Sequence, residues 1–206
     1  MNGPDSTPFF SVIAAYYQGV TGPDVYRRFC ESLLRQSFTS AEVLVLHDGP
    51  LLHEVASPFN ILCTQLRHNM WGHNLRKIGL QHAKGRYILH TNVDNEYHPD
   101  ALRDIHARLQ TTPTGILITR IEMMGLNHGD GKIWYDIPRD YSKSLVLSGN
   151  PPVMGNVDLM QVVISKEIWD TYGWFNFIEQ ADGIIYQKIC SENPYLCTDI
   201  LIGRHY

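Results

Sequence analysis

The chain has 206 residues, a formal net charge of −4 and 44% hydrophobic residues, so a globally disordered chain is excluded and one folded α/β domain is expected. No block of Lys or Arg stands out, which argues against a nucleic-acid-binding surface. The N-terminus lacks a signal-peptide pattern, and no apolar run is long enough for a transmembrane segment. The four cysteines have no zinc-site spacing, and Cys30 and Cys190 fit buried helical positions. These features predict a soluble cytoplasmic protein.

Predicted strands and helices alternate from the N-terminus to residue 121. Apolar runs, several of them β-branched, indicate buried strands at 9–16, 42–46, 60–62, 87–91 and 116–121. Apolar residues at helical spacing and a good start at Pro99 indicate helices at 25–36, 74–82 and 99–109. Such alternation is typical of a doubly wound fold, in which right-handed crossovers join parallel strands.

The pattern is less regular after residue 122. We expect a hairpin strand at 132–135, a buried strand at 159–164, and helices at 166–172 and about 181–189. No Pro-, Gly- or Ser-rich linker separates the two halves, so residues 1–206 are predicted to form a single domain.

A polar and acidic cluster directly follows the predicted strand 87–91. Ligands of open α/β sheets bind beyond the carboxyl ends of the strands, where this cluster would lie. On an extended segment Asn92, Asp94 and Glu96 would share one face. Their oxygen atoms suit Mg²⁺ or Mn²⁺ held against a diphosphate. The alternative is a strand-to-helix loop stabilised by capping side chains.

The motifs follow one another in a specific order. The chain reads FSVIAAYY from Phe10, CESLLRQSF from Cys30, EVLVLHDG from Glu42, LRKIGLQHAKGRYI from Leu75, NVD from Asn92 and HPDAL from His98. In this order it closely resembles the family-2-type glycosyltransferases, from Phe9 to about Ile189. The resemblance implies a GT-A fold, an α/β architecture with a mixed, mainly parallel central sheet flanked by helices. It also implies a nucleotide-binding half at about 9–121 and an acceptor and catalytic half at about 122–206.

The resemblance assigns four residues to the nucleotide. Ala15 and Tyr17 would pack around the base, and Asp48 would accept a hydrogen bond from it. Arg76 matches the arginine of an Ala-Arg-Asn element that lies near the nucleotide. The match is imperfect, because His47 and Lys77 replace residues of the family pattern.

The resemblance also implies a divalent cation, Mn²⁺ or Mg²⁺. Asp94 matches the last carboxylate of an Asp-x-Asp motif that holds the cation on the diphosphate. Asn92 replaces the first aspartate and brings a carbonyl oxygen without a charge, so the cation would depend more on the substrate phosphates. His205 is a candidate second ligand or, alternatively, a frayed terminal residue.

In the family the catalytic base is an aspartate that opens a helix after an aromatic-Gly-Phe stretch. Spacing indicates Asp182 for this role, and Glu179 is the nearest competitor. Both residues could instead serve only as helix N-terminal caps. Asp158 would either face the acceptor or cap a turn, and Trp174 would either stack on a sugar or lie in the core.

The resemblance therefore predicts an inverting, metal-assisted glycosyltransferase that uses a nucleotide-sugar, most simply a UDP-sugar, and a glycan, lipid or protein acceptor. A sugar nucleotidyltransferase is the first alternative, although the loop after the first strand lacks its basic residues. A non-catalytic nucleotide- or carbohydrate-binding module is the second, and Asn92 is the residue that favours it. A homodimer that completes the acceptor side is a further expectation.

Overall fold

The computed structural model describes residues 7–125, 141–178 and 181–206. The strands are β1 (Phe10–Tyr16), β2 (Ala41–His47), β3 (Ile61–Cys63), β4 (Tyr87–Asn92), β5 (Glu96–Tyr97), β6 (Ile116–Met124), β7 (Ser144–Leu147), β8 (Val162–Ser165) and β9 (Leu196–His205). The α-helices are α1 (Pro23–Leu34), α2 (His73–His82), α3 (Ala101–Thr111), α4 (Lys166–Tyr172) and α5 (Ala181–Glu192), and the 3₁₀ helices are η1 (Met70–Gly72) and η2 (Leu159–Gln161).

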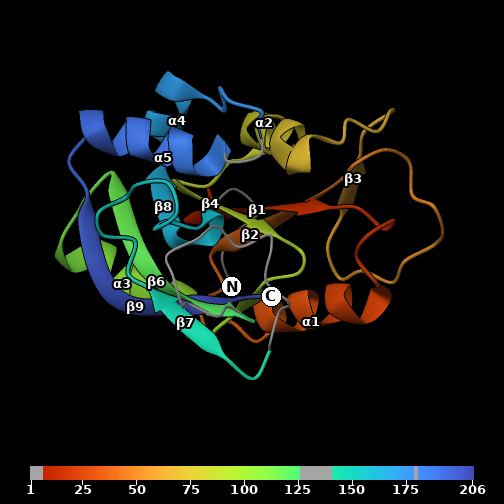
Figure 1. Ribbon diagram of the computed structural model, residues 1–206, viewed down its shortest axis with the longest axis horizontal. Coiled ribbons are helices and arrows are strands. Elements are labelled where there is room, and N and C mark those ends of the chain that lie inside the picture. The colour runs from red at the N-terminus through yellow and green to blue at the C-terminus, as the bar shows by residue number, and fades with distance from the viewer. Residues whose placement is uncertain (1–6, 126–140, 179–180) are drawn as a thin grey trace.

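One mixed sheet runs through the molecule in the order β3-β2-β1-β4-β8-β6-β9-β5, and β7 pairs with β6 (Figure 1). Strands β3, β2, β1 and β4 are parallel neighbours. Strand β8 is antiparallel to both β4 and β6, whereas β9 is parallel to β6. The parallel part therefore comes from the first half of the chain and places the ends of β1, β2 and β4 at one edge.

Helices cover both faces of the sheet. Helices α2, α4 and α5 lie on one face, and α1 and α3 lie on the other (Figure 1). Alternate residues of the strands supply two separate cores. Val12 and Leu89 pack with the α1 and α3 side, whereas Ile13 and Ile88 pack with the α2, α4 and α5 side. Cys30 and Cys190 are buried, as predicted.

Two predictions on secondary structure need correction. The predicted strand 159–164 begins only at Val162, because Asp158 and Gln161 form a capping box that winds residues 159–161 into η2. No strand was predicted after the last helix, yet Leu196–His205 forms β9. The predicted hairpin strand at 132–135 lies outside the described residues. No described helix has both the length and the hydropathy that a membrane span requires.

Candidate active site

The predicted nucleotide residues meet where the parallel strands end. Ala15 lies beside Leu46 of β2 on one side and beside Asn92 of β4 on the other. Tyr17 follows β1 and Asp48 follows β2, so both are at the same edge of the sheet. Loops beyond such an edge form the ligand site of open α/β sheets.

Asp48 holds the loop that precedes α2. Its buried carboxylate accepts hydrogen bonds from the backbone N–H groups of His68 (2.7 Å) and Asn69 (2.9 Å). Arg67 is its ionic neighbour, with Nε 4.0 Å from Oδ2. A carboxylate offers about four acceptor positions, so these bonds leave Asp48 able to accept one from a base.

The turn after this loop has an unusual backbone. Asn69, Met70 and Trp71 have φ angles of 60°, 42° and 48°, a left-handed region that is unfavourable for bulky residues. Gly72 follows with φ 79°, and a Cβ there would lie only 2.7 Å from Cβ of Ala15. Arg76 donates from Nη1 to the Trp71 carbonyl oxygen at 2.7 Å. Two charged side chains therefore hold a strained turn against β1.

Arg76 is the electrostatic centre of the site. Its side chain is buried, and Nη2 donates a hydrogen bond to Oδ1 of Asn92. Burial lowers the pKa of the guanidinium, and the carboxylates of Asp182, Asp158 and Asp94 act in the opposite direction. One buried cation thus faces three acidic residues from three different segments.

Asp182 lies in the first turn of α5. Gly183 beside it lets the chain at Met154 approach, because a Cβ there would lie 3.1 Å from the Met154 Cα. Burial raises the pKa of the Asp182 carboxyl and Asp158 raises it further, while Arg76 and backbone N–H groups partly offset the rise. The competing candidate, Glu179, lies outside the described residues.

Asp158 pairs with His205 instead of facing solvent. Its Oδ1 accepts from the backbone N–H of Met160 at 2.9 Å, and its Oδ2 lies 3.0 Å from Nδ1 of His205. Burial acts to raise the pKa of Asp158, but His205 and the backbone N–H groups outweigh it and the pKa is lowered. Asp158 is therefore a turn cap, one of its two predicted roles, and His205 lies on a strand rather than in a frayed end.

Asn92, Asp94 and Glu96 do not share one face, contrary to the expectation for an extended segment. The chain turns after Asn92, where the Asn95 N–H donates to the Asn92 carbonyl at 3.2 Å. Glu96 starts β5 and contacts Arg35 and the Tyr206 hydroxyl. Because β5 pairs with β9, His205 is brought close to the segment that carries Asp94.

The side chains around Asp94 determine which atoms could bind a cation. Oδ1 of Asp94 is buried without a hydrogen-bond partner among the described residues. Asn92 is bonded to Arg76, and His205 is paired with Asp158. Within the described part of the chain no three His, Cys, Asp or Glu side chains form a metal-binding group. The residues fit a cation held through Asp94, substrate phosphates and water, which is how Mg²⁺ usually binds.

A buried aromatic layer that the sequence did not predict lies beneath Arg76. His73 stacks on Trp174 at 5.6 Å, and His90 meets Trp174 edge-on at 4.8 Å. Burial and the neighbouring Arg76 lower the pKa of His73 to about 4. Trp174 is 3% exposed, so of its two predicted roles the core position is the observed one. Individual histidines in a sequence do not indicate such a layer.

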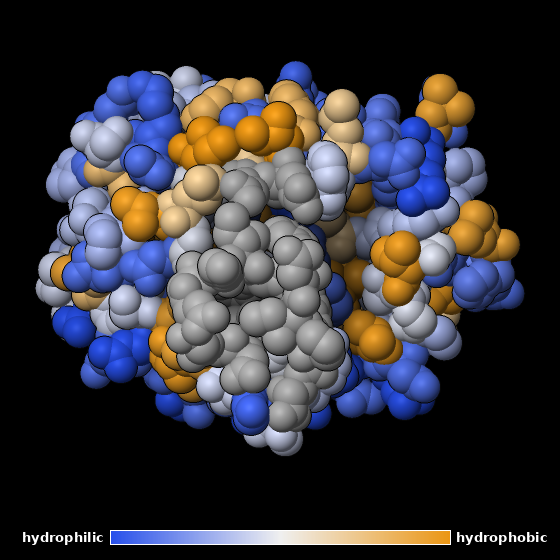
Figure 2. Space-filling model, viewed as in Figure 1, coloured by the Kyte–Doolittle hydropathy of each residue, from blue (hydrophilic) through white to orange (hydrophobic). Residues whose placement is uncertain are grey.

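Figure 2 shows hydrophobic side chains at the upper edge of the molecule, over the segment that joins α4 and α5. Phe175 and Ile178 are exposed there, 42% and 56%. This segment leads directly to Asp182. Apolar side chains thus flank the chain that positions the candidate base.

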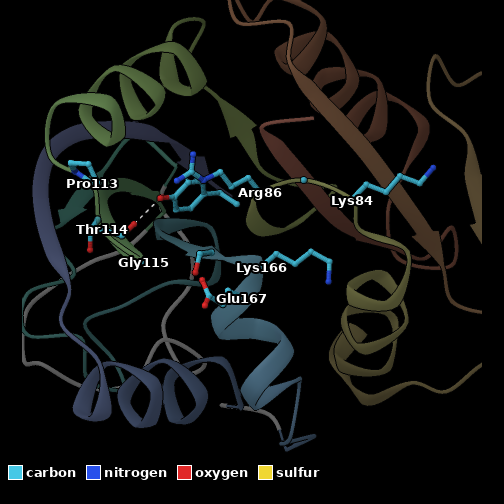
Figure 3. Close-up of a pocket in the computed structure, with 10 residues that line it drawn as sticks. Lys84, Arg86, Pro113, Thr114, Gly115, Lys166 and Glu167 are labelled. Atoms are coloured by element: carbon cyan, nitrogen blue, oxygen red, sulfur yellow. Dashed lines mark hydrogen bonds between the residues drawn. The ribbon is translucent and has the colours of Figure 1, made fainter. Parts of the chain in front are cut away.

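A cavity of about 470 Å³ lies elsewhere, at the opposite end of β4. It is lined by Lys84, Arg86 and Lys166, among others, and Tyr87 donates to the Thr114 carbonyl at 2.8 Å within it (Figure 3). Lys84 and Arg86 extend away from each other in Figure 3. Because this cavity is remote from the carboxyl ends of the parallel strands, it is not part of the candidate active site.

Comparison with known families gives the decisive match. The model of Glycosyl transferase family 2 matches residues 11–164. The chain belongs to this family. The Escherichia coli (strain K12) protein described as the uncharacterized glycosyltransferase YibD is 24% identical over 196 residues. That alignment covers 90% of this chain and 52% of YibD, so the chain spans about half the length of this family 2 relative.

Solved structures share the fold. S. aureus TarS superposes with a TM-score of 0.69 at 14% identity, over 95% of this chain and 36% of TarS. TarS 1–349 in complex with UDP gives 0.65 at 18% identity, over 95% and 60%. The mannosyltransferase PcManGT from Pyrobaculum calidifontis, in complex with GDP-Man and Mn²⁺, gives 0.65 at 14% identity, over 98% and 58%. The predicted GT-A fold is thereby confirmed.

Proposed function

We propose that this family 2 glycosyltransferase moves a sugar from a UDP-sugar to an acceptor hydroxyl with inversion, assisted by a divalent cation. The observation that carries the proposal is the position of Asp182. It is a partly buried carboxylate with a raised pKa. Its charge interacts with that of Arg76, as do the charges of Asp94 and Asp158. A perturbed acid beside a buried cation is a frequent mark of a catalytic site.

Asp182 acts as the general base. The acceptor oxygen attacks the anomeric carbon, its proton passes to the Asp182 carboxylate, and the nucleoside diphosphate leaves from the opposite face. A base works best when its pKa lies near the working pH. The burial and the Asp158 charge that raise the pKa of Asp182 therefore favour proton acceptance, while Arg76 keeps the carboxylate ionised.

The donor is bound at the ends of β1, β2 and β4. Asp48 accepts a hydrogen bond from the base, and Ala15 and Tyr17 pack around it. Asp94 would hold the cation together with the diphosphate, and His205 is paired with Asp158. When bound, a divalent cation would stabilise the negative charge of the leaving diphosphate. Arg76 fixes Asn92 and the strained turn beside this site.

Turnover of nucleotide-sugars in Asp182→Asn is the test. We expect loss of turnover of about a thousandfold, since general base catalysis contributes about 10²–10⁴, with nucleotide affinity retained. The assay follows release of nucleoside diphosphate from a panel of donors with Mn²⁺. Asp170→Asn, an exposed carboxylate on α4 that pairs with Lys166, is the matched control. Full turnover in Asp182→Asn would refute Asp182 as the base, and Glu179→Gln would then be the next variant.

A single domain over residues 1–206, a glycan, lipid or protein acceptor and a cytoplasmic location are part of the same proposal. Glycan, lipid and protein acceptors all offer the required hydroxyl. We also propose a homodimer, which light scattering on the purified chain would test. A mass of one chain in solution would contradict it.

A further inference from the structure

The Arg67 side chain lies on the ring that the proposed function gives to the nucleotide base. Its Cζ is 3.8 Å from the centroid of the Tyr17 ring, and its Nε is 4.0 Å from Oδ2 of Asp48. We propose that Arg67 is a built-in competitor of the base, which must displace the guanidinium to bind. This inference rests on the proposed function, because it requires the base to use Tyr17 and Asp48.

The guanidinium imitates the contacts of a base. It is planar, it stacks on aromatic faces, and it presents N–H donors in its own plane. A nucleobase stacked on Tyr17 with one N–H directed at Asp48 needs the same ring face and the same carboxylate. Two planar groups cannot both lie 3.8 Å above one ring face. Arg67 and the base therefore exclude each other at this position.

The backbone around Arg67 is fixed on both sides. The N–H of the next residue, His68, donates to Asp48 at 2.7 Å. On the other side, the Thr64 hydroxyl accepts from the Gly49 N–H at 2.7 Å and donates to the Leu66 carbonyl at 2.8 Å. The side chain of Arg67 is 47% exposed. Displacement thus requires rotation of one side chain and no movement of the loop.

The Tyr17 ring is also fixed. A Cβ at Gly19 would lie 2.3 Å from Cε1 and 2.6 Å from the hydroxyl oxygen of Tyr17, so the chain at residue 19 packs directly against the ring. The ring cannot turn toward this segment to offer the base another position. Because the Tyr17 ring is fixed, the base can bind only when the Arg67 side chain moves.

Removal of the competitor should strengthen binding. Loss of a partly exposed cation–π contact together with a weak surface ion pair should change the affinity about three- to tenfold. If Arg67 instead formed a wall of the base site or bound the diphosphate, its removal would weaken nucleotide binding. The direction of the change therefore separates the two roles.

The experiment is calorimetric titration of the full chain with UDP, GDP, CDP and ADP. It uses about 0.5 M NaCl, because salt screens the attraction between an exposed cation and the diphosphate. Arg67→Ala is compared with wild type and with Arg27→Ala, which removes an exposed arginine of α1 that pairs with Asp24. We expect about three- to tenfold tighter binding in Arg67→Ala and wild-type affinity in Arg27→Ala.

A gain in affinity cannot result from a damaged fold, so this outcome supports the inference directly. Unchanged or weaker binding in Arg67→Ala, with a nucleotide that binds wild type, overturns the inference and leaves the proposed function intact. If no nucleotide binds any of the three proteins, the proposed function fails, and the inference fails with it.

Discussion

Two partly buried carboxylates in this site, Asp158 and Asp182, have pKa values shifted in opposite directions. Asp158 is paired with His205 and capped by backbone N–H groups, which lower its pKa. Burial raises the pKa of Asp182 and the negative charge of Asp158 raises it further, and Arg76 and backbone N–H groups offset only part of this rise. Groups whose surroundings separate their pKa values tend to divide catalytic roles between them. The structure therefore suits Asp182 for proton transfer and Asp158 for support.

Asp158→Asn tests this coupling. Asparagine keeps the side-chain oxygen that caps Met160 but removes the charge that raises the pKa of Asp182. The carboxylate must be ionised to accept a proton, so activity is lost as pH falls through that pKa. We expect the acidic limb of the kcat/KM profile to move to lower pH in Asp158→Asn, as measured by initial rates across the acidic range.

The control for this profile is Asp170→Asn, which removes a surface charge on α4. Its acidic limb should coincide with that of wild type. An Asp158→Asn limb that stays in place, or moves to higher pH, would mean that Asp158 does not set the pKa of the base.

At the scale of elements, the sequence predicted the parts whose signals are local. Apolar runs identified β1, β2 and β4, and spacing identified α1 and α2, each within a few residues of its observed bounds. Strand β9 was missed because its pattern is weak, although Ile200, Leu201 and Ile202 form a short apolar run. A strand whose partner is β6, about eighty residues earlier, is stabilised by pairing that no local window contains.

In the candidate site, too, residues in local motifs were predicted and long-range contacts were not. Asp48, Arg76 and Asp182 were assigned by resemblance, since each stands at a fixed place in a recognised motif, and their roles stay predictions. The pairing of Asp158 with His205 was not predicted, because it joins a turn to a strand that were read separately. Arg67 carries no motif, and only the fold brings it onto Tyr17. Long-range contacts are therefore the part that sequence patterns left out.

Gly203→Ala tests whether the β5–β9 pairing is required for the fold. A Cβ at residue 203 would lie 2.0 Å from the carbonyl oxygen of Glu96, which belongs to the backbone of β5. Overpacking of this kind costs about 1–3 kcal/mol, so the free energy of unfolding in urea should decrease by about that amount. Because the His205–Asp158 contact beside Asp182 depends on the same pairing, nucleotide-sugar turnover should also decrease.

Gly22→Ala is the matched control, because nothing lies within 4 Å of a Cβ built at that position. It precedes α1 and should change the free energy of unfolding by only a few tenths of a kcal/mol. Equal stability of Gly203→Ala and wild type would show that β5 and β9 can separate at little cost.

At the scale of the whole molecule, the site lies on a core that contains titratable groups. His73 and His90 are buried between the sheet and the α2, α4 and α5 layer, against Trp169 and Trp174. Burial and Arg76 lower the pKa of both histidines. The folded protein therefore keeps this layer neutral, and protonation would place a second buried positive charge next to Arg76.

From these buried histidines we expect the free energy of unfolding to decrease in mild acid. The pKa of His73 falls from its ordinary 6.5 to about 4 in the folded state. Between these values the unfolded chain binds the extra proton, so the free energy of unfolding decreases as pH falls from 6.5 toward 4. One histidine with this shift accounts for about 3 kcal/mol. Urea unfolding at a series of pH values measures the decrease.

His73→Phe isolates the contribution of this residue, because phenylalanine keeps an aromatic ring against Trp174 and cannot be protonated. Its free energy of unfolding should decrease less steeply than that of wild type below pH 6.5, and the two should run parallel above it. His82→Gln, at the exposed end of the same helix, should follow wild type throughout. Parallel curves for His73→Phe and wild type down to pH 4 would show that His73 takes up no proton on unfolding, contrary to its burial beside Arg76.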